Sequence, residues 1–247
     1  MKKSLSRREL LTASALVGSS LALPEIATAR TLSEEVPWAP GVADKPNPIT
    51  PGPFQFFTPY EASWIDAVVS RLIPQDDKGP GAKELGVTVF LDRQLAGSYG
   101  RAERWYMSGP WAKGSETQGY QSRMTPAQLY RAAIKSIDAY CTKTFGDKNF
   151  VQLGVPDQDK VLGELEEGKI KLDDIDAKAF FKQLLLNTQE GFFADPIYGG
   201  NKDMAAWKMI GFPGARYDYR DYVKKHGERF DLPPVSLSGR PGWNPHA

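Results

Sequence analysis

The amino-acid sequence predicts an all-α fold: an irregular helical domain with long structured loops, a proline-rich N-terminal arm and a proline-rich C-terminal tail. Apolar residues recur in several separate stretches at the three- and four-residue spacing of amphipathic helices. Two of these stretches begin with the same start signal, Thr58-Pro59 and Thr125-Pro126. No segment of convincing length alternates apolar and polar residues, which is the pattern of a half-buried strand.

The first 29 residues are predicted to be an export signal rather than part of the fold. Basic residues, among them Arg7 and Arg8, precede an uncharged run from Leu10 to Leu23, and Ala27 and Ala29 form a small-x-small cleavage site. The run is shorter than the roughly 20 apolar residues of a spanning helix. Arg7-Arg8 followed by Leu10-Leu11 indicates a twin-arginine signal, the kind that exports folded proteins. The alternative is an ordinary secretory signal with two adjacent arginines.

Residues 30–57 are predicted to form an extended arm. They contain six prolines, which disfavour helix, and four large aromatic residues, which make the segment too apolar to be only a linker. Three of the aromatic residues, Phe54, Phe56 and Phe57, stand together where the arm meets the first predicted helix.

The helical domain is expected over residues 58–226. Its first helix starts at Thr58, with Pro59 in the first turn and Glu61 completing a capping box, and it stops before Pro74. After a Gly-Pro-Gly loop, a second helix runs from about Val87 to Gly97. Residues 100–119, rich in glycine and aromatic residues without a consistent period, are interpreted as a structured loop.

The second half of the domain repeats these signals. A long helix is expected from Thr125 to about Phe145, a short one over 156–167 closed by Gly168, and another that starts at the cap Asp176. Residues 217–226 are expected to form a last helix, and residues 227–247 form the tail. The predicted organisation is therefore signal 1–29, arm 30–57, helical domain 58–226 and tail 227–247.

The composition of the chain argues against nucleic-acid binding and against most metal, haem and catalytic sites. It has 31 basic and 30 acidic residues; removal of residues 1–29 leaves 27 against 28, so no strong basic field is present and nucleic acid is not an expected partner. One cysteine excludes a disulfide framework or a cysteine-based metal site, and two histidines are few for zinc or for several haems. Nucleotide-binding, metalloprotease, haem-attachment and nucleophile-elbow motifs are absent. No catalytic, cofactor-binding or metal-ligating residue is therefore assigned.

The single cysteine, Cys141, lies on the apolar face of the predicted helix over 125–145. Its position favours a buried structural thiol. The alternative is a disulfide to a partner subunit, because an odd cysteine in an exported protein invites intermolecular pairing.

The segment from Gly191 to Ala215 is the most informative of the chain. Asp195-Pro196 and Gly199-Gly200-Asn201 predict a tight polar turn directly after a helix. Asn201 is a candidate cap for a short helix that carries Trp207 and ends at Gly211. Dense turn chemistry around aromatic residues is typical of a shaped surface. A purely structural corner is equally compatible with the pattern.

These motifs resemble one family, the small (gamma) subunit of membrane-bound gluconate 2-dehydrogenase and its relatives among bacterial sugar and sugar-acid dehydrogenases. The resemblance covers roughly residues 57–215. It includes the twin-arginine start, Leu72-Ile73-Pro74, Gly79-Pro80-Gly81-Ala82 with Gly86-Val87, Ala194-Asp195-Pro196-Ile197-Tyr198-Gly199-Gly200-Asn201, Trp207-Lys208 and Gly211-Phe212-Pro213-Gly214.

The resemblance implies a non-catalytic subunit of a periplasm-facing, FAD-dependent dehydrogenase. In that family a large subunit carries FAD, and a membrane-bound multi-haem cytochrome c passes electrons to quinone. The small subunit has no cofactor of its own and supplies export, maturation and stability to the flavoprotein. The expected location is the periplasm, peripheral to the inner membrane through the complex. The alternative is a free periplasmic folding or binding factor that does not remain with the mature enzyme.

We expect the partner interface to combine the end of the arm with the turn after Gly191. Extended proline-rich arms bind partners at a low ordering cost, and Trp and Tyr often dominate interface energies. The interface requires Trp207 to be exposed, because a buried Trp207 would be a core residue. The candidate interface residues are Phe54, Phe56, Phe57, Asp195, Pro196, Tyr198, Gly199, Gly200, Asn201 and Trp207.

Overall fold

The computed structural model describes residues 52–237, except for 113, 116, 217–218 and 229–231. The predicted signal with Arg7, Arg8, Ala27 and Ala29 lies outside the described residues. So do most of the proline-rich arm and the end of the tail.

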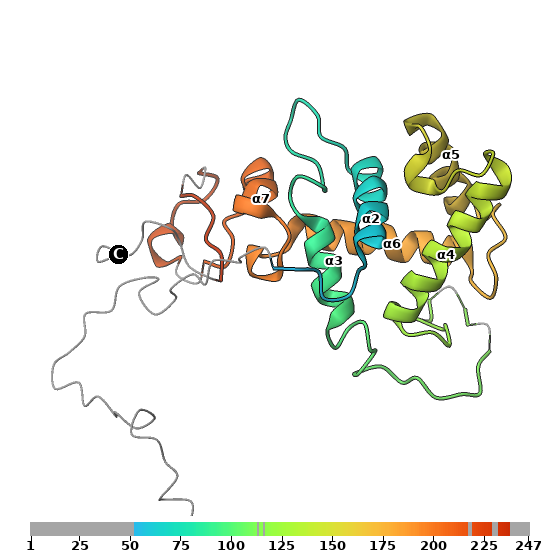
Figure 1. Ribbon diagram of the computed structural model, residues 1–247. Helices are drawn as coiled ribbons and strands as arrows, with labels where there is room; N and C mark the ends of the chain where they lie inside the picture. The colour runs from blue at the N-terminus through green and yellow to red at the C-terminus, as the bar shows by residue number, and fades with distance from the viewer. Residues whose placement is uncertain (1–51, 113, 116, 217–218, 229–231, 238–247) are drawn as a thin grey trace, which may run out of the picture. The chain divides into compact units, whose positions relative to one another are not determined.

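All regular elements in the described ranges are helical, which confirms the all-α prediction. Short 3₁₀ turns and long loops connect the α-helices (Figure 1). The α-helices are α2 (Pro59–Leu72), α3 (Val87–Ala96), α4 (Pro126–Thr144), α5 (Val155–Glu166), α6 (Ala177–Phe193) and α7 (Ala205–Ile210). The 3₁₀ turns are η1 (Phe150–Gln152), η2 (Pro196–Tyr198), η3 (Lys202–Met204) and η4 (Arg220–Tyr222).

Helix starts follow the sequence signals closely. Thr58 and Thr125 each accept a hydrogen bond from the third residue of their helix, and the side chains of Glu61 and Gln128 reach back to the cap backbone. Each arrangement is a complete capping box with proline in the first turn. Asp176 caps α6 through Ala179, as predicted. The helix predicted over 217–226 is wrong in type, because its described residues hold only the 3₁₀ turn η4.

The core forms around α6, which contacts α2, α3, α5 and α7 (Figure 1). Its buried face includes Phe180, Leu184 and Phe192. Helix α2 contributes Trp64 and Ile65, which are fully buried, and the Trp64 ring packs on Phe150 with centroids 5.1 Å apart. This packing gives α6 a fixed end at Phe193, from which the turn toward α7 begins.

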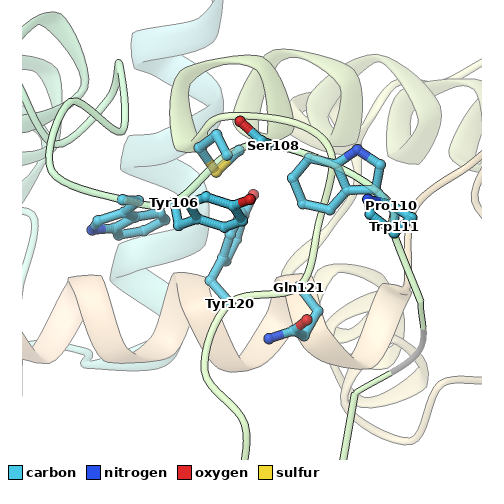
Figure 2. Close-up of a pocket in the computed structure, with 8 residues that line it drawn as sticks. Tyr106, Ser108, Pro110, Trp111, Tyr120 and Gln121 are labelled. Atoms are coloured by element: carbon cyan, nitrogen blue, oxygen red, sulfur yellow. The ribbon is translucent and has the colours of Figure 1, made fainter.

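The long loop between α3 and α4 is closed at its base. The Ala127 amide donates to the Gly100 carbonyl, and a Cβ at Gly100 would lie 1.9 Å from the Leu95 carbonyl oxygen, so only glycine fits there. The loop carries an open pocket lined by aromatic side chains (Figure 2). The structured loop predicted over 100–119 is thus confirmed for its described residues, which exclude 113 and 116.

The tail returns to the helical domain just after α7. Val235 pairs with Gly214 in an isolated parallel bridge, and the Ala215 amide donates to the Val235 carbonyl at 2.7 Å. Within the described residues, no helix is both long and apolar enough to cross a membrane.

Candidate functional site

The turn after α6 is held by a nearly buried carboxylate. Asp195 is 8% exposed and accepts three hydrogen bonds, from the Ile197 amide at 3.0 Å, the Ser236 hydroxyl at 2.6 Å and the Leu237 amide at 2.7 Å. The first bond starts the 3₁₀ turn η2, and the other two fix the returning tail. Asp195 is therefore a structural clamp between the turn and residues 236–237.

Asn201 connects the end of α6 to the start of α7. It is fully buried in the left-handed region at φ 46°, a conformation that asparagine tolerates better than most residues. Its side-chain amide donates to the Ala194 carbonyl, and its side-chain oxygen accepts from the Ala206 amide, both at 2.9 Å. Asn201 thus binds an amide in the first turn of α7, but the prediction that it is the N-cap of this helix is wrong, because η3 intervenes and the N-cap position is Met204.

Trp207 is a core residue of this chain, which corrects its assignment to the partner interface. Only 5% of it is exposed. Its indole N–H donates to the Phe193 carbonyl at 2.8 Å, and its ring meets Phe212 edge-on with centroids 5.1 Å apart. Burial and a satisfied indole N–H mean that Trp207 fixes α7 against the end of α6.

The glycines of the turn permit close backbone approach. A Cβ at Gly200 would lie 2.1 Å from the Gly191 carbonyl oxygen, so the turn packs directly on the α6 backbone. Gly199 has φ 99°, which strongly favours glycine. Gly200, Asp195 and Asn201 are buried, so these predicted interface residues shape the surface from below rather than form it.

Exposed apolar side chains are concentrated in the same segment of the chain as this scaffold. Each member is between 41% and 57% exposed, and all belong to residues 193–212. We call this group the apolar surface: Phe193, Ile197, Tyr198, Met209, Ile210 and Phe212. Tyr198 is the predicted interface residue that belongs to it, and half-buried Pro196 and Gly199 lie beside it in the chain. Concentrations of exposed apolar residues of this kind mark interaction sites.

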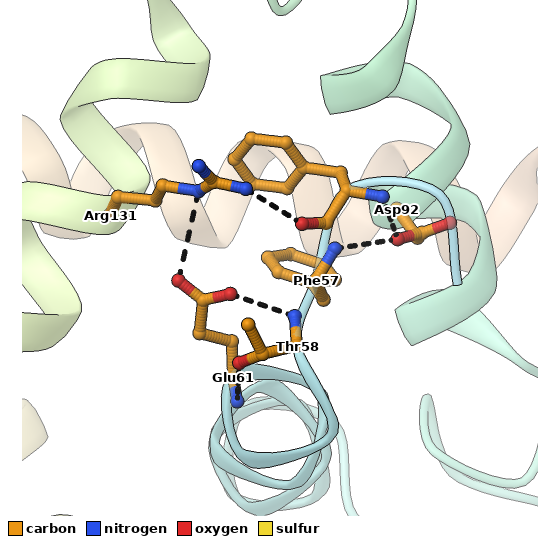
Figure 3. A network of polar contacts seen from close by, with 6 residues as sticks. Phe57, Thr58, Glu61, Asp92 and Arg131 are labelled. Carbon is orange, nitrogen blue, oxygen red and sulfur yellow. Dashed lines mark hydrogen bonds and ion pairs between the residues drawn. The ribbon is translucent and has the colours of Figure 1, made fainter. Parts of the chain in front are cut away.

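The end of the arm is bound to the chain's own helical domain (Figure 3). The carboxylate of Asp92 on α3 is fully buried and accepts hydrogen bonds from the amides of Gln55, Phe56 and Phe57 at 2.8, 2.8 and 2.9 Å. Phe57 is 4% exposed and belongs to the core. The prediction that Phe57 contacts a partner is therefore wrong.

Phe56 is also engaged inside the chain. The Arg131 guanidinium lies 4.5 Å from the Phe56 ring centroid and donates to the Phe56 carbonyl at 2.9 Å (Figure 3). Arg131 is 3.8 Å from the carboxylate of Glu61, which also closes the α2 capping box. Of the three predicted aromatic residues, Phe54 alone is exposed, at 43%.

The remaining buried polar groups have structural partners. Tyr99 and Tyr130 both donate to the side-chain oxygen of Asn187 at 2.9 Å, and burial raises the pKa of Tyr99 to about 12.

Cys141 is fully buried, and desolvation, reinforced by the charge of Asp138, raises the pKa of its thiol to about 12. The burial predicted for Cys141 is confirmed, and its geometry disfavours a disulfide to a partner. No group of three metal-ligating side chains occurs in the described ranges.

Sequence reasoning missed Asp92 and most of the apolar surface. Asp92 lies among the apolar residues Phe90, Leu91 and Leu95, and this position indicated a buried carboxylate that needs hydrogen-bond partners. Nothing in the sequence indicated that these partners are the backbone amides of residues 55–57, more than thirty residues earlier in the chain. Met209, Ile210 and Phe212 lie in and after a six-residue helix, which is too short to show a period.

A comparison with protein-family models gives a match that covers most of the described residues. The family model for gluconate 2-dehydrogenase subunit 3 matches residues 59–214. The matched region begins with α2 and ends just after the apolar surface. No curated protein and no solved structure matches the chain.

Proposed function

Because the chain belongs to the gluconate 2-dehydrogenase subunit 3 family, a family of subunits with partner chains, we propose that it is a non-catalytic small subunit of an FAD-dependent sugar-acid dehydrogenase. The partners in this proposal are a large FAD-containing subunit and a membrane-bound multi-haem cytochrome c. FAD and haem belong to those chains and not to this one. In this proposal the complex faces the periplasm, and this subunit is peripheral to the inner membrane through its complex.

The apolar surface is the observation that supports this proposal best. Its side chains are large and exposed, yet the segment beneath them is fixed by Asp195, Asn201 and Trp207. A rigid apolar patch binds a partner without the cost of ordering a loop. Aromatic residues and methionine are enriched in such interfaces, and this surface has three aromatic residues and Met209.

In this proposal, the large FAD-containing subunit binds to the apolar surface. Three charged residues, Lys202, Asp203 and Lys208, are exposed in the same segment as the apolar surface. An apolar centre with charged residues at its rim is the usual composition of a stable protein–protein interface. Export of a folded flavoprotein on the signal of this chain would also require such an interface before transport.

Purification tests the proposal against its alternative. A tagged chain isolated with its native partners from detergent-solubilised membranes should elute with flavin and haem absorbance in constant ratio. A colourless chain that elutes alone, from cells that contain the active dehydrogenase, would contradict the subunit proposal. That result would favour a free periplasmic folding or binding factor.

The export role has its own test. We propose that Arg7 and Arg8 direct both this chain and the FAD-loaded large subunit to the twin-arginine pathway. The complex must then form in the cytoplasm with about micromolar affinity or tighter, roughly −8 kcal/mol. Replacement of both arginines by lysine should leave both subunits in the cytoplasm, with FAD still bound. Normal amounts of flavoprotein in the periplasm of that variant would show that export is not shared.

A further inference from the structure

The aromatic pocket lies in the loop between α3 and α4, within a different segment from the apolar surface. It has a volume of about 500 Å³ and is open to solvent (Figure 2). This volume is in the range of small-molecule sites. Its lining residues are Trp105, Tyr106, Met107, Ser108, Pro110, Trp111, Tyr120 and Gln121.

Contacts within the chain hold one wall of the pocket in place without a ligand. The rings of Trp105 and Tyr120 pack with centroids 4.9 Å apart, and Tyr99 meets Trp105 edge-on at 5.7 Å. The Tyr120 hydroxyl donates to the Met124 carbonyl at 2.6 Å, next to the cap of α4. Through Asn187, Tyr99 connects this wall to α6. The wall is therefore fixed to two helices, although it belongs to a loop.

Hydrogen-bonding groups surround the aromatic surfaces. Tyr106, which is 85% exposed, and Ser108 contribute hydroxyls, and Gln121 contributes an amide with both donor and acceptor atoms. Figure 2 shows the ring of Trp111 across the pocket from Tyr106 and Tyr120. The eight lining residues are all uncharged. Such a lining offers a carboxylate or phosphate no ion pair, while it can pair with neutral hydroxyls.

We infer that this pocket binds a neutral saccharide ring. One face of a hexose ring presents C–H groups whose hydrogens are slightly positive, and an aromatic face is slightly negative. The rim of the same ring presents hydroxyls that the Tyr106, Ser108 and Gln121 side chains can satisfy. A site of about 500 Å³ holds one or two such rings. The inference does not rest on the proposed dehydrogenase role, because an uncharged lining favours a neutral sugar over a sugar acid.

Fluorine NMR of the full chain can test this site directly. The six tryptophans are replaced biosynthetically by 5-fluorotryptophan, and single Trp-to-Phe variants assign the signals. Titration with methyl α-glucoside should shift the Trp105 and Trp111 signals saturably, with half-saturation at about 1 to 30 mM for so small a ligand. Trp64 and Trp207 are buried elsewhere and should not shift.

Two variants and a second ligand test whether binding is specific to this pocket and to a neutral sugar. Tyr106→Ala removes a highly exposed side chain, so the fold should persist while affinity falls at least about fivefold. Tyr198→Ala, at an exposed tyrosine of the apolar surface, should leave sugar affinity unchanged. Sodium gluconate should bind at least about threefold more weakly than the glucoside, because the lining supplies no cation.

Three results would overturn the inference. The first is no saturable shift below about 200 mM glucoside, well above the expected range. The second is equal or tighter binding of gluconate. The third is a shift of Trp105 and Trp111 by a proline-rich peptide but not by the sugar, which would make the pocket a peptide-docking site.

Discussion

Asp92 shows how one side chain can fix a whole segment. Its carboxylate has no exposed surface, and its three short hydrogen bonds all come from backbone amides of residues 55–57. A carboxylate that accepts several amide bonds is well compensated for its burial. Because Phe57 enters the core at this point, the carboxylate determines where the arm joins the helical domain.

Asp92→Asn should therefore be strongly destabilising. One oxygen would become an N–H donor that faces a backbone N–H, which leaves buried donors unpaired. We expect the free energy of unfolding, measured by urea denaturation, to fall by about 2–4 kcal/mol. The matched control is Asp159→Asn, whose carboxylate is 47% exposed in its ion pair with Arg71 and should cost less than about 1 kcal/mol. Equal losses for the two variants would contradict the anchoring role.

Cys141 yields a prediction about pH. Its thiol has an ordinary pKa of 9.0 that burial raises to about 12 in the folded chain. Between these values the unfolded chain loses the thiol proton and the folded chain keeps it, so stability falls as pH rises. One such group contributes a slope of at most about 1.4 kcal/mol per pH unit. Cys141→Ala should flatten the decline in unfolding free energy measured between about pH 9 and 10.5. An unchanged slope would contradict the burial of this thiol.

The helices differ in how much of them the sequence could predict. α2 and α4 have a Thr-Pro start, a Glu or Gln at the third position and a regular apolar face, and these local signals determined their bounds. α7 has six residues and depends on contacts from Asn201 and Phe193. Such contacts are absent from a local pattern. For this reason the sequence correctly predicts the turn but wrongly predicts that Trp207 is exposed on its surface.

The contact between the turn and α6 can be tested with two glycines. Gly200→Ala would place a Cβ 2.1 Å from the Gly191 carbonyl oxygen, against backbone that cannot easily move. Urea denaturation should show a loss of at least about 2 kcal/mol. Gly163, inside α5, has no atom within 4 Å of its Cβ position, so Gly163→Ala should be neutral or stabilise by up to about 1 kcal/mol. A Gly200→Ala chain as stable as the original would mean that the turn does not pack as described.

In the molecule as a whole, the residues that hold the turn and the arm in place differ from the residues that are exposed for contact with a partner. Most of the predicted interface residues turned out to hold the fold together, either beneath the apolar surface or at the Asp92 anchor. The residues that form the surface are their neighbours in sequence. A motif can therefore identify the right region from sequence while its individual side chains point inward, because a shaped surface requires a fixed scaffold.

The central claim is that the chain binds its flavoprotein partner through the apolar surface. Its most direct test is co-purification with the variant Ile210→Lys, which places a charge at a side chain that is 57% exposed at the C-terminal end of α7, where a cation suits the helix dipole. The control is Leu186→Lys, at a comparably exposed leucine of α6 outside this surface. We predict that Ile210→Lys lowers the flavin recovered with the tagged chain at least about tenfold, which corresponds to about 1.4 kcal/mol, while Leu186→Lys retains it. Full recovery of flavin with Ile210→Lys, or equal loss with both variants, would contradict the claim.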